Sequence, residues 1–304
     1  MKLKKLAAID IGSNSIRLLI TNVIHEPKKG YTYYKKSSMT RLPIRLGADS
    51  FVKGKISAQN RKRMIDAMVA YRAIMDVHGV EDFRACATSA MREASNGDML
   101  VEQIKKHTGI EIEIIDGMEE ARLIFESKMF DRLGTKEDRY LYIDVGGGST
   151  ELTVLENREI VNSHSFKIGT VRLLNGMDNP GEWDFMKRWI EENVPRGDDL
   201  AIIASGGNIN KLHKLSGKKL SEPLSMRYLN HQEKELGSLT RDERVTEIGL
   251  NFDRADVIVH ALKIYKSAMQ WSHARNMYVP KIGVSDGIVR DLYHRKYREE
   301  LEGA

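Results

Sequence analysis

Two stretches of the chain share one hydrophobic pattern, in which a short apolar run ends at an aspartate and gives way to small polar residues. Residues 7–20 read AAIDIGSNSIRLLI, and residues 141–154 read LYIDVGGGSTELTV. An apolar run of this length that stops at glycine is typical of a buried strand. Because apolar residues resume after each polar break, we expect a strand, a tight turn and a second strand in both places.

The two stretches align without a gap. Asp10 aligns with Asp144, and Gly12 aligns with Gly146. The copies are separated by about one domain length. A repeat over this distance indicates a duplicated domain, each half presenting a strand–turn–strand loop.

The glycines at 146–148 have a chemical as well as a structural reading. Glycine allows a tight turn with positive φ and lets a ligand approach bare backbone. Successive N–H groups in such a turn form a nest that binds anions. A plain glycine-rich β-turn would be the better explanation of one such run alone, but the second copy favours a phosphate site.

One aligned position of the repeat differs in charge. Arg17 in the first copy corresponds to Glu151 in the second, so one loop offers a cation and the other a carboxylate. This difference fits one phosphate held by two opposed loops. Asp144 and Glu151 flank the second turn, and two carboxylates beside a phosphate-sized nest indicate a metal-assisted phosphoryl site. Asp10 is a further metal candidate.

A third turn has the same character. Residues 200–204 form an apolar run that we expect to be a buried strand, and it is followed by Ser205, Gly206 and Gly207. The turn precedes a predicted helix over 209–215. A helix N-terminus beside glycine suits phosphate or nucleotide, so we expect these residues to contact one or the other.

The remaining pattern predicts an α/β chain. Three strands at 6–11, 16–23 and 31–38 match the start of a ribonuclease H-like sheet, and residues 41–54 look irregular. Further strands are expected at 83–87, 110–115, 159–167 and 279–284. Helices are expected at 57–78, 98–107, 118–133, 181–193 and 254–271, with a final helix after residue 287.

Three charged residues near helix starts are candidates for chemistry. Arg92 lies at a strand-to-helix junction, where a guanidinium can fork onto phosphate oxygens; an exposed helical arginine is an equally good reading. Glu119 and Glu120 open the helix at 118–133, where the helix dipole favours acids. Either glutamate is a candidate general base for water, and spacing alone does not choose between them.

Bulk properties narrow the class of protein. A length of 304 residues suggests about two domains. The net charge of +5 suits a polyanionic substrate but carries little weight. A single cysteine, Cys86, excludes an intrachain disulfide and predicts a reducing cytoplasm. The N-terminal apolar run is too short for a signal peptide, and no run is long enough to span a membrane.

Several enzyme classes lack their signatures. The chain has no GxxxxGK[ST] loop, so we do not expect a P-loop enzyme. No Cys/His group has zinc spacing, and none of the nine histidines is followed by aspartate. A Ser–His–Asp triad therefore cannot be argued from these histidines.

Taken together, these stretches resemble the exopolyphosphatase/guanosine pentaphosphate phosphohydrolase family (Ppx/GppA). The resemblance rests on DIGSNSIRL at 10–18, ATSAMREASN at 87–96, DGMEEARLIF at 116–125 and DVGGGSTEL at 144–152. ASGGNIN at 204–210 and RADVIVHA at 254–261 extend it over nearly the whole chain. The second and third motifs make the match specific, because actin and sugar kinases carry similar phosphate loops.

The resemblance implies an α/β fold of two ribonuclease H-like domains, of the actin-like ATPase superfamily, with the active site in an interdomain cleft. We place the domains at 1–117 and 118–304, with the last helix free to pack on the first domain. The implied reaction is Mg²⁺-dependent removal of a terminal phosphate from inorganic polyphosphate, or of the 5′ γ-phosphate from pppGpp. We expect no nucleic acid and no membrane partner, and allow a homodimer.

The resemblance also implies residue roles. The catalytic glutamate of the family falls on Glu120, and its metal-site acids fall on Asp144 and Glu151. Its phosphate contacts fall on Ser13, Asn14, Arg92, Gly147, Gly148 and Ser149. We add Gly12, Arg17 and Gly146 from the loops themselves.

The chain departs from the sequence pattern of the family in two places, and two alternative functions remain. The family often has GTGG where this chain has Ser205 and its glycines, and GVSDGI at 283–288 replaces a common arginine-glutamate-glycine ending. The match is to the short, two-domain members. An actin-like ATPase or kinase is one alternative function, and a non-catalytic (p)ppGpp sensor is the other.

Overall fold

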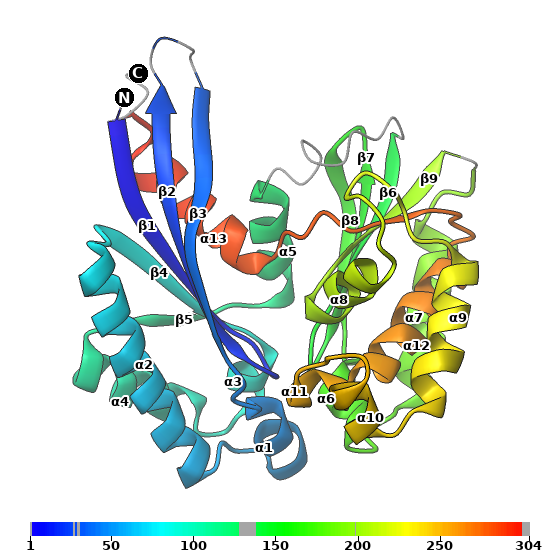
Figure 1. Ribbon diagram of the computed structural model, residues 1–304, viewed down its shortest axis with the longest axis horizontal. Coiled ribbons are helices and arrows are strands. Elements are labelled where there is room, and N and C mark those ends of the chain that lie inside the picture. Colours follow the sequence, from blue (N-terminus) through cyan, green and yellow to red (C-terminus); the bar gives the residue numbers. More distant parts are fainter. Residues whose placement is uncertain (1, 27, 29–30, 128–137, 198, 300–304) are drawn as a thin grey trace. The chain divides into compact units, whose positions relative to one another are not determined.

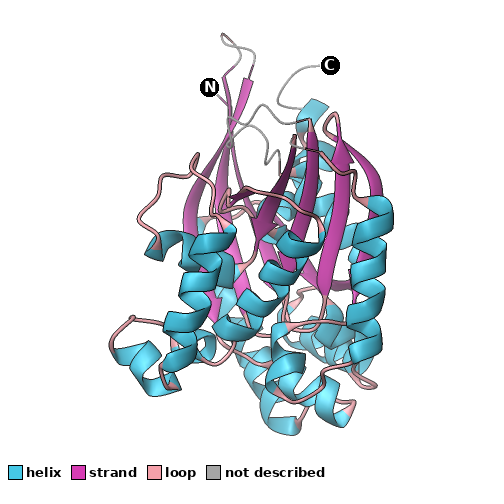
Figure 2. Cartoon of the chain, turned by 90° about the vertical axis from the view of Figure 1, so that its right-hand side faces the viewer, coloured by secondary structure: helices cyan, strands magenta, loops and turns pink. Residues whose placement is uncertain are grey.

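A computed structural model describes residues 2–26, 28, 31–127, 138–197 and 199–299. The chain divides into two compact units (Figure 1). Unit 1 comprises Met1–Ser127 and Gly283–Ala304, and unit 2 comprises Lys128–Ile282. Each unit is a five-stranded sheet with helices packed beside it (Figure 2).

The sheet of unit 1 has the strand order β3-β2-β1-β4-β5. Strand β1 pairs antiparallel with β2 and parallel with β4, β2 pairs antiparallel with β3, and β4 pairs parallel with β5. The strands are β1 Lys2–Ile11, β2 Ile16–Glu26, β3 Tyr31–Leu42, β4 Asp82–Ala87 and β5 Ile112–Ile114.

The sheet of unit 2 repeats this topology. Its order is β8-β7-β6-β9-β10, with β6 antiparallel to β7 and parallel to β9. The strands are β6 Arg139–Val145, β7 Thr150–Glu156, β8 Glu159–Phe166, β9 Leu200–Ser205 and β10 Met277–Tyr278. The same order and the same strand directions confirm the duplication that the repeat predicted.

The helices of unit 1 are α1 Leu46–Lys53, α2 Ala58–His78, α3 Ser89–Glu93, α4 Gly97–Thr108, α5 Gly117–Glu126 and α13 Val284–Lys296. Those of unit 2 are α6 Thr170–Leu174, α7 Pro180–Asn193, α8 Gly207–Leu215, α9 Met226–Ser238, α10 Arg241–Thr246, α11 Phe252–Ala255 and α12 Ile258–Trp271. Within the described residues, no helix combines the length and hydrophobicity needed to cross a bilayer.

Three of the expected elements differ from the structure. Helix α1 lies in the segment 41–54 that looked irregular, and it ends at Gly54, whose φ is 68°. The helix expected at 254–271 is broken into α11 and α12. The strand expected at 279–284 is wrong, because only Met277–Tyr278 pairs with β9 and α13 begins at Val284.

The helix expected at 118–133 is α5, which ends at Glu126. The later turns of that expected helix lie outside the described residues. The expected domain boundary at 117/118 also differs from the division into units. Helix α5 packs on α13 and belongs to unit 1. Helix α13 packs on β1 as well, so the end of the chain returns to unit 1.

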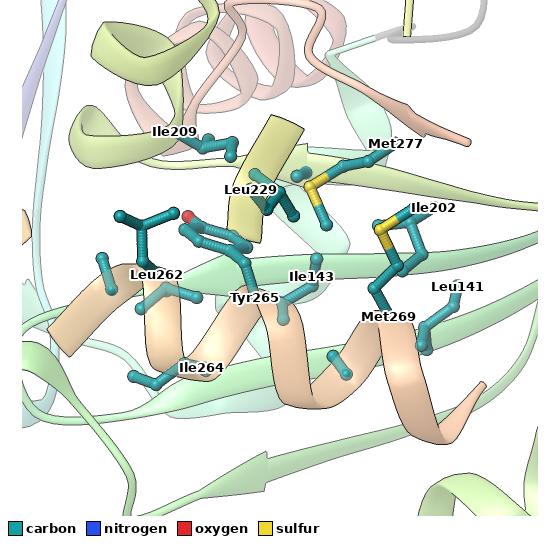
Figure 3. Close-up of a cluster of buried hydrophobic side chains, with 14 of the residues drawn as sticks. Leu141, Ile143, Ile202, Ile209, Leu229, Leu262, Ile264, Tyr265, Met269 and Met277 are labelled. Atoms are coloured by element: carbon teal, nitrogen blue, oxygen red, sulfur yellow. The ribbon is translucent and has the colours of Figure 1, made fainter. Parts of the chain in front are cut away.

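Helix α12 forms the centre of the unit 2 core (Figure 3). Leu262, Tyr265 and Met269 of α12 belong to one hydrophobic cluster with Leu141 and Ile143 of the central strand β6, and all five side chains are buried. Successive strand residues point to opposite faces. The core packing of Leu141 and Ile143 therefore places Tyr142 and Asp144 on the other face of the sheet.

Helices α5 and α13 approach each other at Gly287. A methyl group built at this glycine would lie 1.7 Å from the Leu123 carbonyl oxygen of α5. No side chain fits at that distance, so glycine is required by the close backbone approach. The approach fixes α5, which carries Glu119 and Glu120.

Gly287→Ala is expected to lower the free energy of unfolding by about 1–3 kcal/mol or more, the usual cost of overpacking. The matched control is Gly237→Ala in α9, where nothing lies within 4 Å of the new methyl group. That change should leave stability unchanged or raise it by about 0.5–1 kcal/mol. Urea unfolding of both variants checks this, and equal effects would contradict the role of Gly287.

Candidate active site

The two repeated loops have the same turn. The Gly12 N–H donates to the Ser15 carbonyl at 3.1 Å, and the Gly146 N–H donates to the Ser149 carbonyl at 2.9 Å. A methyl group at Gly146 would lie 3.1 Å from that carbonyl oxygen. The loop glycines at 12 and 146–148 do not adopt positive φ, so that expectation is wrong. Close approach within the turn explains Gly146.

The carbonyl groups of the second loop are occupied by the start of α6. Thr170 N–H donates to the Gly146 carbonyl at 3.0 Å, and Val171 N–H donates to the Gly147 carbonyl at 2.8 Å. In the described chain, no acceptor takes the N–H groups of Gly147, Gly148 and Ser149. The loop is therefore held from its acceptor side and can offer its donors to an anion.

Arg172 is a supporting residue that the sequence reasoning missed. Its Nε donates to the Gly148 carbonyl at 2.6 Å, and the side chain is buried. A buried arginine directly behind the glycine loop adds positive potential where a phosphate would bind. The sequence offered only one hint, a glycine followed closely by an arginine at the end of the β8 hairpin.

Asp144 and Glu151 face each other across β6 and β7. They are direct register partners in an antiparallel pair, so their side chains share one face of the sheet. Asp144 is 9% exposed and Glu151 is 1% exposed. The Ser165 hydroxyl donates to Glu151 Oε1 at 2.9 Å. Two buried carboxylates side by side offer oxygen ligands for a cation.

The corresponding pair of unit 1 has opposite charges. Asp10 and Arg17 are register partners, and Arg17 Nη1 lies 3.3 Å from Asp10 Oδ2. The Ser285 hydroxyl donates to the same oxygen at 3.3 Å. Burial raises the pKa of Asp10, while Arg17 opposes the rise. Asp10 thus has a protein cation as its partner, and its predicted role as a metal ligand stays a prediction.

The acid pair suits one kind of metal better than others. Among the described residues, no group of three or more His, Cys, Asp or Glu side chains is arranged to hold a metal ion. Zinc sites usually need three or four such ligands. Mg²⁺ is commonly held by one or two carboxylates, with water and substrate phosphates completing its shell. Asp144 and Glu151 fit Mg²⁺ in this sense.

The first loop contacts two helix starts in unit 1. The Ser13 and Ser89 hydroxyls are 2.9 Å apart, and the Gly47 N–H donates to the Ser13 carbonyl at 2.9 Å. Arg92 lies in α3 and is exposed, but its Nη1 donates to the Ile115 carbonyl at 2.6 Å. The structure therefore brings Ser13 to Ser89, whereas it ties Arg92 to the backbone before α5.

The third turn lies against the carboxylate pair of unit 2. Gly206 has a φ of 115°, a conformation that favours glycine, and a methyl group there would lie 3.3 Å from Asp144 Oδ1. Ser205 is 2% exposed, and its hydroxyl is hydrogen-bonded to the Tyr142 hydroxyl. The Ser205 side chain thus faces the interior, so any substrate contact of this turn would use its backbone or Gly207.

The two glutamates of α5 have different surroundings. Arg122 donates to Glu119 through Nε at 2.7 Å, and Arg84 donates to it at 3.2 Å. The hydrogen bonds from Arg122, followed by those from Arg84, lower the pKa of Glu119 to about 2. So acidic a carboxylate is a poor proton acceptor near neutral pH. Glu120, which is 9% exposed, remains the better candidate for a base.

The ion pairs of Glu119 extend into a larger network. Asp291 of α13 accepts from Arg84 Nη1 and from Arg122 Nη2, both at 2.8 Å. Arg84 also forks onto Glu113 of β5. This network joins α5 to β4, β5 and α13 within unit 1. It gives Glu119 a structural role that the sequence pattern did not reveal.

Glu119→Gln is expected to lower the free energy of unfolding at pH 7, because the amide loses the ion pairs to both arginines. The pKa of Glu119 is depressed in the folded state. Its contribution is therefore complete above the ordinary value of 4.5 and is lost as the pH falls through about 2. Urea unfolding between pH 7 and pH 3 should show the two proteins converging in stability below this ordinary value.

The control for this measurement is Glu111→Gln. Glu111 pairs with Lys105 at 2.9 Å on the surface, so solvent screens the pair and the effect should be smaller. A stability difference between the protein and Glu119→Gln that stays constant down to pH 3 would contradict the assigned pKa shift.

Comparison with known proteins gives these residues a context. A profile of the Ppx/GppA phosphatase family matches residues 35–296. The chain is 24% identical to exopolyphosphatase 1 of Mycobacterium leprae, over 98% of this chain and 91% of that protein. It is 24% identical to the guanosine-5′-triphosphate,3′-diphosphate pyrophosphatase of Photobacterium profundum, over 97% of this chain and 60% of that protein.

Some relatives are longer than the matched region. The chain is 28% identical to a bifunctional 3-dehydroquinate synthase/phosphatase of Fusobacterium nucleatum over 87% of its length, but spans only 43% of that protein. Among solved structures, an exopolyphosphatase from Cytophaga hutchinsonii has a TM-score of 0.82 and 25% identity, covering 96% of this chain and 98% of its own. The fold is thus the expected actin-like ATPase fold.

Proposed function

Because the chain belongs to the Ppx/GppA phosphatase family, we propose that it is a phosphohydrolase that removes a terminal phosphate from inorganic polyphosphate, from pppGpp, or from both. One observation supports this most strongly. The buried Asp144–Glu151 pair lies beside a glycine loop whose carbonyl groups are already occupied. This arrangement combines a cation site with donors for phosphate oxygens.

Each residue of the second loop has a defined task in this proposal. The N–H groups of Gly147, Gly148 and Ser149 donate to the oxygens of the terminal phosphates. Arg172 holds the Gly148 carbonyl and adds positive charge behind the loop. Asp144 and Glu151 would hold Mg²⁺. When bound, Mg²⁺ neutralises the charge that builds up on the leaving phosphate.

Unit 1 supplies the proton chemistry. Glu120 accepts a proton from water as the water oxygen bonds to the terminal phosphorus, and the bond from that phosphorus to the bridging oxygen breaks. Ser13 and Asn14 of the first loop contact phosphate oxygens, and Arg17 contributes charge while paired with Asp10. Glu119 takes no part in the proton transfer, because its pKa of about 2 keeps it ionised in its ion pairs.

Phosphate release is the direct test. We expect Mg²⁺-dependent release from at least one of three substrates: short polyphosphate, long polyphosphate or pppGpp. Glu120→Gln should lower turnover by about 10²–10⁴-fold, which is the usual contribution of a general base, while substrate binding remains. Glu119→Gln should be much milder, since it removes an anchor of α5 and no proton acceptor.

The outcomes separate the alternatives. Equal turnover in Glu120→Gln would remove Glu120 from the role, and a complete loss only in Glu119→Gln would identify the other glutamate as the base. Phosphate release from ATP that depends on an added acceptor would favour a kinase. Tight ppGpp binding without release from any of the three substrates would favour the sensor.

The expected cellular location and the expected partners of the chain are also part of the proposal. A cytoplasmic location fits the single cysteine, Cys86, which is buried and cannot form an intrachain disulfide. A homodimer and the absence of a nucleic acid partner stay predictions. Sedimentation of the full chain would test the first of these.

A further inference from the structure

Two tyrosine hydroxyls hold the Ser205–Gly206 turn from different sides. Tyr265 of α12 is fully buried, and its hydroxyl donates to the Ser205 carbonyl at 2.5 Å. Figure 3 shows Tyr265 rising from α12 among apolar neighbours. Tyr142 of β6 is hydrogen-bonded through its hydroxyl to the Ser205 hydroxyl. The hydroxyl and the carbonyl of Ser205 are therefore both bound by tyrosine.

The turn that these tyrosines hold is in contact with Asp144. Ser205 is the register partner of Asp144 in the parallel β6–β9 pair. The position of a Gly206 methyl group would be 3.0 Å from the Tyr265 hydroxyl, 3.2 Å from the Val145 carbonyl and 3.3 Å from Asp144 Oδ1. Any shift of the turn would therefore change the space around the Asp144 carboxylate.

We propose that Tyr265 and Tyr142 are positioning residues, which hold the Gly206 turn against Asp144 and thereby set the affinity of the Asp144–Glu151 pair for a divalent cation. The inference rests on the proposed function, because it assumes that this acid pair is the cation site. It concerns how the site is held in shape, and it assigns no substrate contact to either tyrosine.

The chemistry of Tyr265 supports this role. Its hydroxyl donates to the Ser205 carbonyl at 2.5 Å from within the apolar core. A buried tyrosine hydroxyl requires such a partner. Phenylalanine would fill the same apolar space in α12, so the hydroxyl is the part of the residue that the core does not require.

The other member of the acid pair has its own support. Ser165 of β8 donates to Glu151 Oε1, which fixes one of its two oxygens. Asp144 is restrained from the opposite side of β6 by the Gly206 turn. Groups that orient metal-binding side chains in this way typically change metal affinity by about 10–100-fold when removed.

The test is direct cation binding to the full chain, with Mn²⁺ as the probe and no substrate present. Electron paramagnetic resonance of free Mn²⁺ gives the dissociation constant. We expect Tyr265→Phe to weaken binding about tenfold and Tyr142→Phe to weaken it in the same direction. Both changes keep the aromatic ring, so the fold should be retained.

Tyr228→Phe is the matched control. Tyr228 of α9 donates its hydroxyl to the Leu212 carbonyl at 2.7 Å, which is the same kind of bond in the same unit. It should cost similar stability in urea unfolding and leave Mn²⁺ binding unchanged. Equal Mn²⁺ affinity in Tyr265→Phe and the unsubstituted protein, or equal weakening in Tyr228→Phe, would overturn the positioning role.

A second measurement separates this inference from the proposed function. In phosphate release, Tyr265→Phe should raise the Mg²⁺ concentration for half-maximal rate about tenfold and leave the substrate KM at saturating Mg²⁺ unchanged. A higher KM without a higher Mg²⁺ requirement would overturn the inference. No Mn²⁺ binding by the unsubstituted protein would also overturn it, whereas Mn²⁺ binding without phosphate release from any substrate would overturn only the proposed function.

Discussion

The candidate site is organised around two buried carboxylates that share one face of the unit 2 sheet. Asp144 and Glu151 face each other at the register position where unit 1 has the ion pair of Asp10 and Arg17. The duplicated sheet thus carries an acid paired with a base in unit 1 and two acids side by side in unit 2. Mg²⁺ is commonly held by one or two carboxylates. The acid pair of unit 2 therefore offers a cation site at the position where unit 1 has an ion pair.

Close backbone contacts surround this pair and keep it in place. Gly169 lies so near the second loop that a methyl group would stand 2.4 Å from the Gly147 carbonyl oxygen. A methyl group at Gly206 would likewise lie close to Asp144, and one at Gly287 would lie close to the backbone of α5 in unit 1. Small residues at these contacts let the loops and helices touch through backbone atoms, which hold their positions better than flexible side chains. These glycines therefore fix the positions of the loops and helices as well as allowing the chain to turn.

The sequence predicted the parts of the fold and site that are encoded locally. Apolar runs ending at Asp10 and Asp144 identified the central strands and the duplication. The different surroundings of Glu119 and Glu120 could not be predicted from the sequence. They depend on Arg84 and Asp291, which are distant in the chain. The inward direction of Ser205 depends likewise on Tyr142 and Tyr265. The strand expected at 279–284 failed because a buried apolar run has the same pattern whether or not it pairs with a neighbour.

Binding of Mg²⁺ to the Asp144–Glu151 pair can be measured directly by thermal unfolding with and without Mg²⁺, in the unsubstituted protein and in Glu151→Gln. If the pair is a cation site, Mg²⁺ at a hundredfold excess over its Kd should stabilise the unsubstituted protein by about 2.7 kcal/mol. Glu151→Gln should gain little stability from Mg²⁺, because the amide removes one of the two carboxylates that would hold the cation. The same gain from Mg²⁺ in both proteins would contradict the account, since the cation would then bind elsewhere.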